Sequence, residues 1–136
     1  MDDRQEIHDL FVRYTTALDA GDVETIVGCF TADGALESPA VGVYAGRPGI
    51  REFAERFARF HERGAQLRHF ISNLAVQVTG DEARATCYLL NVITRAGKTE
   101  LMPPGRYDCK LAKVGGQWLF RHRLVVLDGD AKLDGI

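Results

Sequence analysis

The chain has 136 residues, of which 46% are hydrophobic and 26% charged, and its formal net charge is −2. These values are typical of one ordinary globular domain, which we expect to span residues 1–136. A slightly acidic chain without blocks of like charge is not expected to bind nucleic acid. No apolar run approaches the roughly 20 residues that span a bilayer, and the polar N-terminus does not resemble a signal peptide. We therefore expect a cytoplasmic protein with no membrane partner.

The three cysteines, Cys29, Cys87 and Cys109, lie far apart in the sequence. An odd number without a C-x-x-C pair matches neither a disulfide framework nor a zinc ribbon, so we expect buried free thiols. No set of His, Cys, Asp and Glu has metal-ligand spacing, and no glycine-rich phosphate loop follows a strand. The sequence therefore predicts neither a metal nor a cofactor.

The first half of the chain has helical periodicity. A one-sided apolar stripe runs through residues 7–18, and Gly21 suits the left-handed position that follows a helix. Asp22 is placed to cap a second, short helix. The other elements expected in this half are two small strands, near Ala35–Glu37 and Val41–Tyr44, and a third helix over Pro48–Arg63.

The second half changes to the composition of strands. Four long runs are rich in β-branched and aromatic residues, and glycine-containing turns separate them. These runs are Gln66–Thr79, Ala83–Arg95, Leu101–Val114 and Trp118–Leu127. The order predicts an α+β fold in which three N-terminal helices pack on one face of a curved, mainly antiparallel sheet. Such a sheet must curl, which leaves a conical space around an apolar pocket.

Several segments resemble one superfamily over nearly the whole chain. Tyr14-Thr-Thr-Ala-Leu-Asp19-Ala-Gly21-Asp22, Phe30-Thr-Ala-Asp33-Gly-Ala and Gly46-Arg-Pro-Gly-Ile50-Arg-Glu-Phe53 resemble the N-terminal half of ketosteroid isomerases and SnoaL-like, polyketide-cyclase-like proteins. Leu67-Arg-His69-Phe-Ile-Ser-Asn73 resembles the third strand of scytalone dehydratase and hexachlorocyclohexane dehydrochlorinase. Gly105-Arg-Tyr107 and Gly116-Gln-Trp118-Leu-Phe120 also fit this group. The resemblance implies a nuclear transport factor 2-like (NTF2-like) fold, also called cystatin-like, which hosts many chemistries and some pure binders.

The ketosteroid isomerase pattern fits the sequence only in part. That enzyme pairs a carboxylate base with a tyrosine and a protonated aspartate. Tyr14 matches the tyrosine, but Ser38 stands at the base position and cannot abstract a proton from carbon. Asp108 could match the protonated acid, yet strand alternation places it on the face opposite Tyr107 and Cys109.

The dehydratase pattern fits better, because Asp19 and His69 match its aspartate at the end of the first helix and its histidine on the third strand. A neutral imidazole can take a proton near pH 7, and a carboxylate on its other nitrogen fixes the tautomer. Asp19 also sits in the last turn of a helix, where the dipole disfavours an anion. The structural alternatives are that Asp19 begins a turn, that His69 is an ordinary core or surface histidine, and that Tyr14 is a core aromatic.

Other residues are expected to line the pocket with the catalytic candidates Asp19, His69 and Tyr14. The apolar ones lie on the apolar side of a helix or at strand positions that alternate toward the helices. The polar ones are expected to lie close to the pocket. Together these residues are Phe11, Glu37, Phe53, Phe57, Leu67, Asn73, Asn91, Tyr107 and Trp118. We expect no role in the site for His8, His61 or His122. Alternation predicts that Arg121 and Arg123 share one face, which we interpret as a solvated or interfacial edge, with an anion site as the alternative.

The resemblance implies a cofactor-independent lyase or isomerase, dehydratase-like, acting on a hydrophobic, oxygenated cyclic small molecule. Two other classes stay open: a non-catalytic binding module, and an accessory subunit like the β subunits of ring-hydroxylating dioxygenases. Apolar positions on the outer sheet face further predict a homo-oligomer, dimer or trimer. These positions are Phe70, Leu74, Val76, Tyr88, Leu90 and Val92.

Overall fold

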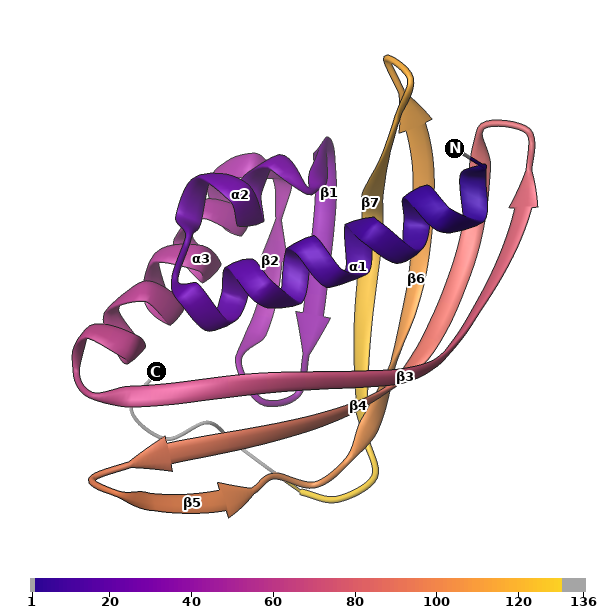
Figure 1. The fold of residues 1–136 in the computed structure, drawn as a ribbon. Helices are drawn as coiled ribbons and strands as arrows, with labels where there is room; N and C mark the ends of the chain where they lie inside the picture. Colours follow the sequence, from indigo (N-terminus) through magenta and orange to yellow (C-terminus); the bar gives the residue numbers. More distant parts are fainter. Residues whose placement is uncertain (1, 131–136) are drawn as a thin grey trace.

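The helices lie along one face of a seven-stranded sheet in the computed structural model, which describes residues 2–130 (Figure 1). The helices are α1 (Asp3–Ala20), α2 (Val23–Gly28) and α3 (Gly46–Glu62). The strands are β1 (Phe30–Ser38), β2 (Gly42–Ala45), β3 (Ala65–Thr79), β4 (Glu82–Arg95), β5 (Lys98–Leu101), β6 (Gly105–Val114) and β7 (Gln117–Leu127). The expected α+β fold class is therefore confirmed.

The strand order is β2-β1-β7-β6-β4-β3, and β5 pairs with β4 outside this path. Only the pairing of β1 with β7 is parallel, so the sheet is mainly antiparallel as expected. One predicted strand is wrong in its bounds: within the run Leu101–Val114 the strand β6 begins only at Gly105, and Leu101 is the last residue of the separate strand β5. Residues 102–104 read Met-Pro-Pro, and proline has no N–H group to donate to a ladder.

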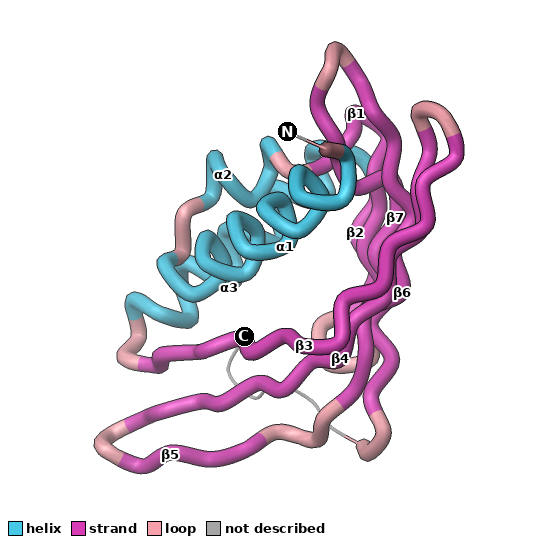
Figure 2. The backbone as a smooth tube through the Cα atoms, turned by 45° about the vertical axis from the view of Figure 1, so that its right-hand side comes forward, coloured by secondary structure: helices cyan, strands magenta, loops and turns pink. Residues whose placement is uncertain are grey.

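The two ends of the sheet differ in direction, and this difference creates the space for a site. Figure 1 shows α1 crossing the front of the sheet while the first part of β3 runs beneath α1 and α3. In Figure 2 the start of β3, the end of β4 and β5 extend under the helices, and the other strands rise behind them. Side chains from α1, α3, β1, β3, β4, β6 and β7 line a cavity between these two layers.

A β-bulge in β3 changes which face its side chains occupy. Ser72 pairs with Tyr88 and Ala75 with Thr86, so two residues of β3 oppose one residue of β4. Asn73 has a φ of 58°, in the left-handed region that asparagine tolerates. Beyond the bulge, Leu74 and Val76 pack against the core. The prediction that these two side chains face outward is wrong, because simple alternation does not survive an inserted residue.

A second bulge in β7 corrects the prediction for the two arginines. Lys110 pairs with His122 and Leu111 with Phe120, which leaves Arg121 as the extra residue. Arg121 is exposed and Arg123 is completely buried, so they do not share a face. The inserted residue shifts the alternation by one and turns Arg123 toward the helices.

Candidate active site

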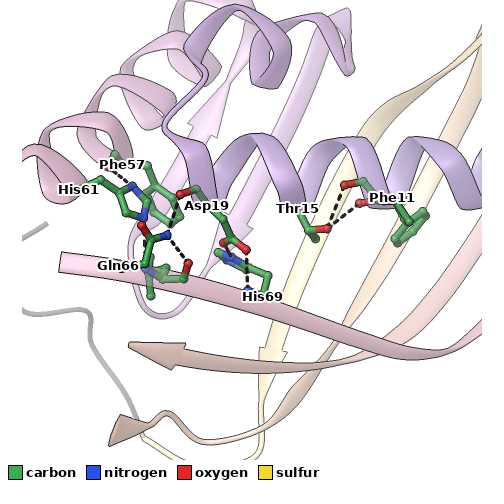
Figure 3. A network of polar contacts seen from close by, with 9 residues as sticks. Phe11, Thr15, Asp19, Phe57, His61, Gln66 and His69 are labelled. Atoms are coloured by element: carbon green, nitrogen blue, oxygen red, sulfur yellow. Dashed lines mark hydrogen bonds and ion pairs between the residues drawn. The ribbon is translucent and has the colours of Figure 1, made fainter. Parts of the chain in front are cut away.

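Asp19 and His69 form a close pair between the end of α1 and the start of β3 (Figure 3). The Oδ1 atom of Asp19 lies 2.5 Å from Nδ1 of His69, and its Oδ2 atom accepts the backbone N–H of His69 at 3.1 Å. The His69 side chain is 3% exposed and that of Asp19 13%. One carboxylate therefore holds both the ring and the backbone of the histidine, which fixes the imidazole orientation.

The end of α1 places this carboxylate. The helix ends at Ala20, and Gly21 follows in the left-handed conformation with a φ of 66° while its N–H donates to Ala17 and Leu18 carbonyls. An anion in a last turn is disfavoured by about 0.3–1 kcal/mol. The two donors from His69 offset this penalty, since hydrogen bonds to charged groups contribute about 1.5–3 kcal/mol each.

A second layer of hydrogen bonds holds the helix end against β3. Gln66 donates its amide N–H groups to the backbone carbonyls of Asp19 and Leu67, both at 2.8 Å (Figure 3). The first of these satisfies a carbonyl that the helix end leaves without an intrahelical partner. The network fixes the backbone on both sides of the Asp19–His69 pair.

His61 belongs to this supporting network, contrary to the expectation that it has no part in the site. Its Nδ1 lies 2.9 Å from the Phe57 carbonyl, and its Nε2 accepts the Leu67 N–H at 3.3 Å. This combination requires the neutral ring with the proton on Nδ1. Burial lowers the pKa of His61, in agreement with a neutral imidazole. His61 thus joins the end of α3 to the start of β3.

His69 opens onto a narrow cavity, and Asp19 stands behind it. Among the expected lining residues, the structure places six around this cavity: Tyr14, Phe53, Phe57, His69, Asn91 and Tyr107. Its other walls were not anticipated: Leu18, Leu36, Ser38, Ala40, Val41, Leu89, Met102, Pro103, Val125 and Leu127. Several of them are apolar strand residues whose side chains alternate toward the helices. Strand alternation identifies such residues in the sequence, but it does not show whether they line a cavity or fill the core.

The free space inside the cavity is small. Its free volume is about 40 Å³, enough for about three water molecules at ~10–15 Å³ each. Ser38, Ala40 and Val41 of the β1–β2 hairpin contribute to its wall, as do Met102 and Pro103 of the β5–β6 connection. A ligand containing a ring must displace part of this wall, and turn and connection residues are the segments that move most easily.

Five expected lining residues lie elsewhere. Phe11 packs edge-on against Phe120 in the core, and Leu67 is completely buried. The Glu37 carboxylate is 3.4 Å from Nε2 of His122. Asn73 is exposed at the β3 bulge, and the indole N–H of Trp118 donates to Asp3 at 2.9 Å, at the start of α1. These five positions are not cavity residues, because burial or strand phase alone does not place a side chain at an opening.

The polar groups of the wall are few. Asn91, directly opposite His69 in the β3–β4 pairing, has a buried amide oxygen that accepts no hydrogen bond within residues 2–130. Ser38 lines the cavity, and its hydroxyl accepts the Ala40 N–H at 3.2 Å. Asp108 is half-buried in the opposite strand phase from buried Tyr107, as expected. The arrangement is that of a mainly apolar site with a few orienting polar groups.

Tyr14 and Tyr107 form part of the inner wall, and Arg123 lies behind them. Burial raises the pKa of both phenols, while the positive charge of Arg123 opposes this effect. The Arg123 guanidinium lies 4.2 Å from the Tyr14 ring centre and 4.0 Å from that of Tyr107. Strand alternation placed Arg123 on one face with Arg121, because the bulge that turns Arg123 inward is visible only in the pairing register.

Within residues 2–130, no group of three or more His, Cys, Asp or Glu side chains is arranged to hold a metal ion. None of the helices in the same range is long and apolar enough to cross a membrane. Cys29, Cys87 and Cys109 are buried free thiols, as expected.

Comparison with known structures defines the class of protein. A protein from Novosphingobium aromaticivorans, described as NTF2-like with a cystatin-like fold, is 26% identical with a TM-score of 0.80, over 95% of this chain and 84% of its own. An aspartate-to-asparagine variant of Rv3472, a Mycobacterium tuberculosis protein of unknown function, is 32% identical with a TM-score of 0.82, over 91% of this chain and 75% of its own. The fold is therefore NTF2-like.

The family follows from the sequence match. The model of the SnoaL-like domain matches residues 1–124, and the chain belongs to this family. A Catenulispora acidiphila protein solved in complex with S-DNPA is 27% identical with a TM-score of 0.78, over 92% of each chain. The search of functionally curated proteins found no match. Members of the family include polyketide cyclases and dehydratases.

Proposed function

We propose that this protein is a cofactor-independent lyase or isomerase that removes a proton from carbon in a hydrophobic, oxygenated cyclic small molecule. The observation that carries the proposal is the Asp19–His69 pair at the cavity. Because Asp19 occupies Nδ1, the nitrogen that remains for a substrate is Nε2 of His69. A histidine held in this way matches the requirement for a general base.

The reaction gives one role each to His69, Asp19 and Tyr14. Nε2 of His69 takes a proton from a carbon next to a carbonyl, and the Asp19 carboxylate stabilises the imidazolium that forms. The electron pair of the broken C–H bond moves onto the carbonyl oxygen, where the Tyr14 hydroxyl donates a hydrogen bond to the enolate. Return of the proton to another carbon gives an isomerase, and departure of a β-hydroxyl as water gives a dehydratase.

The cavity walls support the substrate class. Phe53, Phe57, Leu36, Leu89 and Val125 present apolar surface, and only a few polar side chains accompany them. The family includes polyketide cyclases and dehydratases, and the similar Catenulispora acidiphila protein was solved in complex with S-DNPA. These likenesses support a cyclic, oxygenated molecule over a polar metabolite.

The proton-abstraction step can be tested without knowing the natural substrate. 2-Tetralone is a bicyclic ketone with acidic α-protons, and NMR in D₂O records their replacement by deuterium. The purified protein is expected to accelerate this exchange above the buffer rate, and His69→Ala to return it to that rate. General base catalysis contributes about 10²–10⁴-fold, which sets the size of the expected loss.

Two matched variants control the experiment. His8→Ala removes an exposed histidine, and Ser38→Ala removes a hydroxyl at the position that is a carboxylate in ketosteroid isomerases. Both are expected to exchange 2-tetralone at the wild-type rate. The proposal is contradicted if the wild-type protein does not accelerate exchange above the buffer rate, or if His69→Ala keeps the wild-type acceleration. The protein is then a binding module and not an enzyme that uses His69 to abstract a proton.

We also propose that the outer sheet face forms a homo-oligomer. Four apolar residues, Phe70, Tyr88, Leu90 and Val92, form an outer-face patch, smaller than the sequence indicated because Leu74 and Val76 turn inward. Phe70 and Tyr88 are 57% and 60% exposed. Large exposed aromatic side chains gathered on one sheet face favour association with a second copy of the chain.

A further inference from the structure

Arg123 is a buried cation without a counter-ion. Its side chain is completely buried, and Nε, Nη1 and Nη2 form no hydrogen bond of standard geometry with residues 2–130, although the Tyr107 hydroxyl interacts with the guanidinium. None of the ion pairs recorded for these residues includes it. A guanidinium remains charged at every physiological pH, and a buried charge with no counter-ion is strongly disfavoured.

Aromatic rings surround the guanidinium. The centres of the Tyr107, Tyr14 and Phe120 rings lie 4.0, 4.2 and 4.2 Å from the guanidinium carbon, and that of Phe11 lies 5.2 Å away. The negative faces of these rings attract the cation and repay part of its desolvation. The rings carry no net charge, however, so they do not neutralise the guanidinium.

The neighbouring thiols are not counter-ions either. Burial raises the pKa of Cys87 to about 11 and that of Cys109 to about 12, and it raises the pKa of Cys29 as well. All three thiols are therefore neutral near pH 7. The positive charge acts on whatever lies beyond the two tyrosines that separate it from the cavity.

Those two tyrosines connect the cation to the site. Tyr14 and Tyr107 contact the guanidinium with their rings and also line the cavity. Their phenols stay protonated because burial raises the pKa of each, so both hydroxyls are available as donors. A cation against the ring withdraws electron density from the phenol oxygen, which makes its O–H a stronger donor to an anion.

We propose that Arg123 is a positioning residue that makes Tyr14 and Tyr107 a binding site for an oxyanion, so that the ligands of this cavity are conjugated enolates or phenolates. The inference rests on the proposed function, in which an enolate oxygen forms as His69 removes a proton. Arg123 touches neither substrate nor base, and it acts through the two phenols. The ligand supplies the negative charge that the buried guanidinium lacks.

The probe for this site is 4-nitrophenol, because its absorption spectrum separates the phenol from the phenolate. 4-Nitroanisole has the same ring but no ionisable oxygen, and it serves as the neutral reference. Wild-type protein is expected to bind the phenolate in preference to 4-nitroanisole. Arg123→Met is expected to weaken phenolate binding by about tenfold or more, with 4-nitroanisole binding unchanged. Arg123→Lys retains the charge and is expected to restore part of the preference.

Two further variants make the outcome decisive. Arg121→Met removes an exposed arginine from the same strand and is expected to bind both probes as the wild type does. The double variant Tyr14→Phe with Tyr107→Phe keeps the rings around the guanidinium, so it tests the hydroxyls even if Arg123→Met does not fold. This double variant is expected to lose the phenolate preference.

The inference is overturned if wild-type protein binds the phenolate no better than 4-nitroanisole, or if Arg123→Met or the double tyrosine variant keeps the full preference. The base proposal is tested separately, since the exchange of 2-tetralone depends on His69, whereas the preference for the phenolate over 4-nitroanisole depends on Arg123 and the two tyrosines. A phenolate preference that depends on Arg123, in a protein without 2-tetralone exchange, supports the oxyanion site and refutes the base.

Discussion

The substitution Asp19→Asn tests whether the carboxylate directs the histidine. In the structure the two oxygens of Asp19 accept two different donors of His69, the ring N–H and the backbone N–H. Asparagine has one acceptor oxygen, and its NH₂ group must face the other donor. If that oxygen keeps the backbone N–H, the NH₂ group donates to Nδ1, and the ring proton moves to Nε2.

A proton on Nε2 prevents this nitrogen from acting as a base toward the cavity. We therefore expect Asp19→Asn to slow the exchange of 2-tetralone by about 10²–10⁴-fold. The fold is expected to survive with a loss of about 1–3 kcal/mol in the free energy of unfolding, since one charge-assisted acceptor is lost. NMR exchange in D₂O and urea denaturation measure the two effects.

The double variant Asp19→Asn with His69→Ala sharpens the test. Because the two residues act as one unit, the double variant is expected to be no slower than His69→Ala alone. Asp22→Asn is the matched control: it lies three residues away and keeps an acceptor for the Thr25 N–H. If Asp19→Asn retains exchange within about threefold of the wild type, the carboxylate does not set the tautomer, and the assignment of the pair is wrong.

Three other predictions concern stability and assembly. Gly21→Ala is expected to cost about 1–2 kcal/mol in urea denaturation, because φ is 66° and L-residues resist that region. The free energy of unfolding is expected to fall as pH drops below about 6.5 toward the lowered pKa of folded His61. Protonation there removes the acceptor for the Leu67 N–H; His61→Ala is expected to flatten this pH dependence and His8→Ala to preserve it. Phe70→Arg is expected to convert an oligomer into a monomer in light scattering, and a monomeric wild type at micromolar concentration would contradict the oligomer proposal.

Local signals in the sequence were enough to predict the helices and to select Asp19 and His69 as candidate catalytic residues. The apolar stripe and Gly21 predicted where α1 ends, and the observed end at Ala20 agrees closely. The positions of Asp19 and His69 were available from motif resemblance, since each lies near an element end that local patterns define. Such features depend on residues within about one helical turn or one strand, so a linear pattern records them.

The strand faces were decided only by the tertiary structure. The bulges at Asn73 in β3 and Arg121 in β7 each insert one residue into a ladder, and the side chains beyond them exchange faces. The register that requires these bulges is set by pairing with β4 and β6, which are distant in sequence. Alternation alone therefore placed Leu74 and Arg123 on the wrong face. The inward turn of Arg123, and with it the charge behind the cavity, follows from long-range pairing that no local pattern contains.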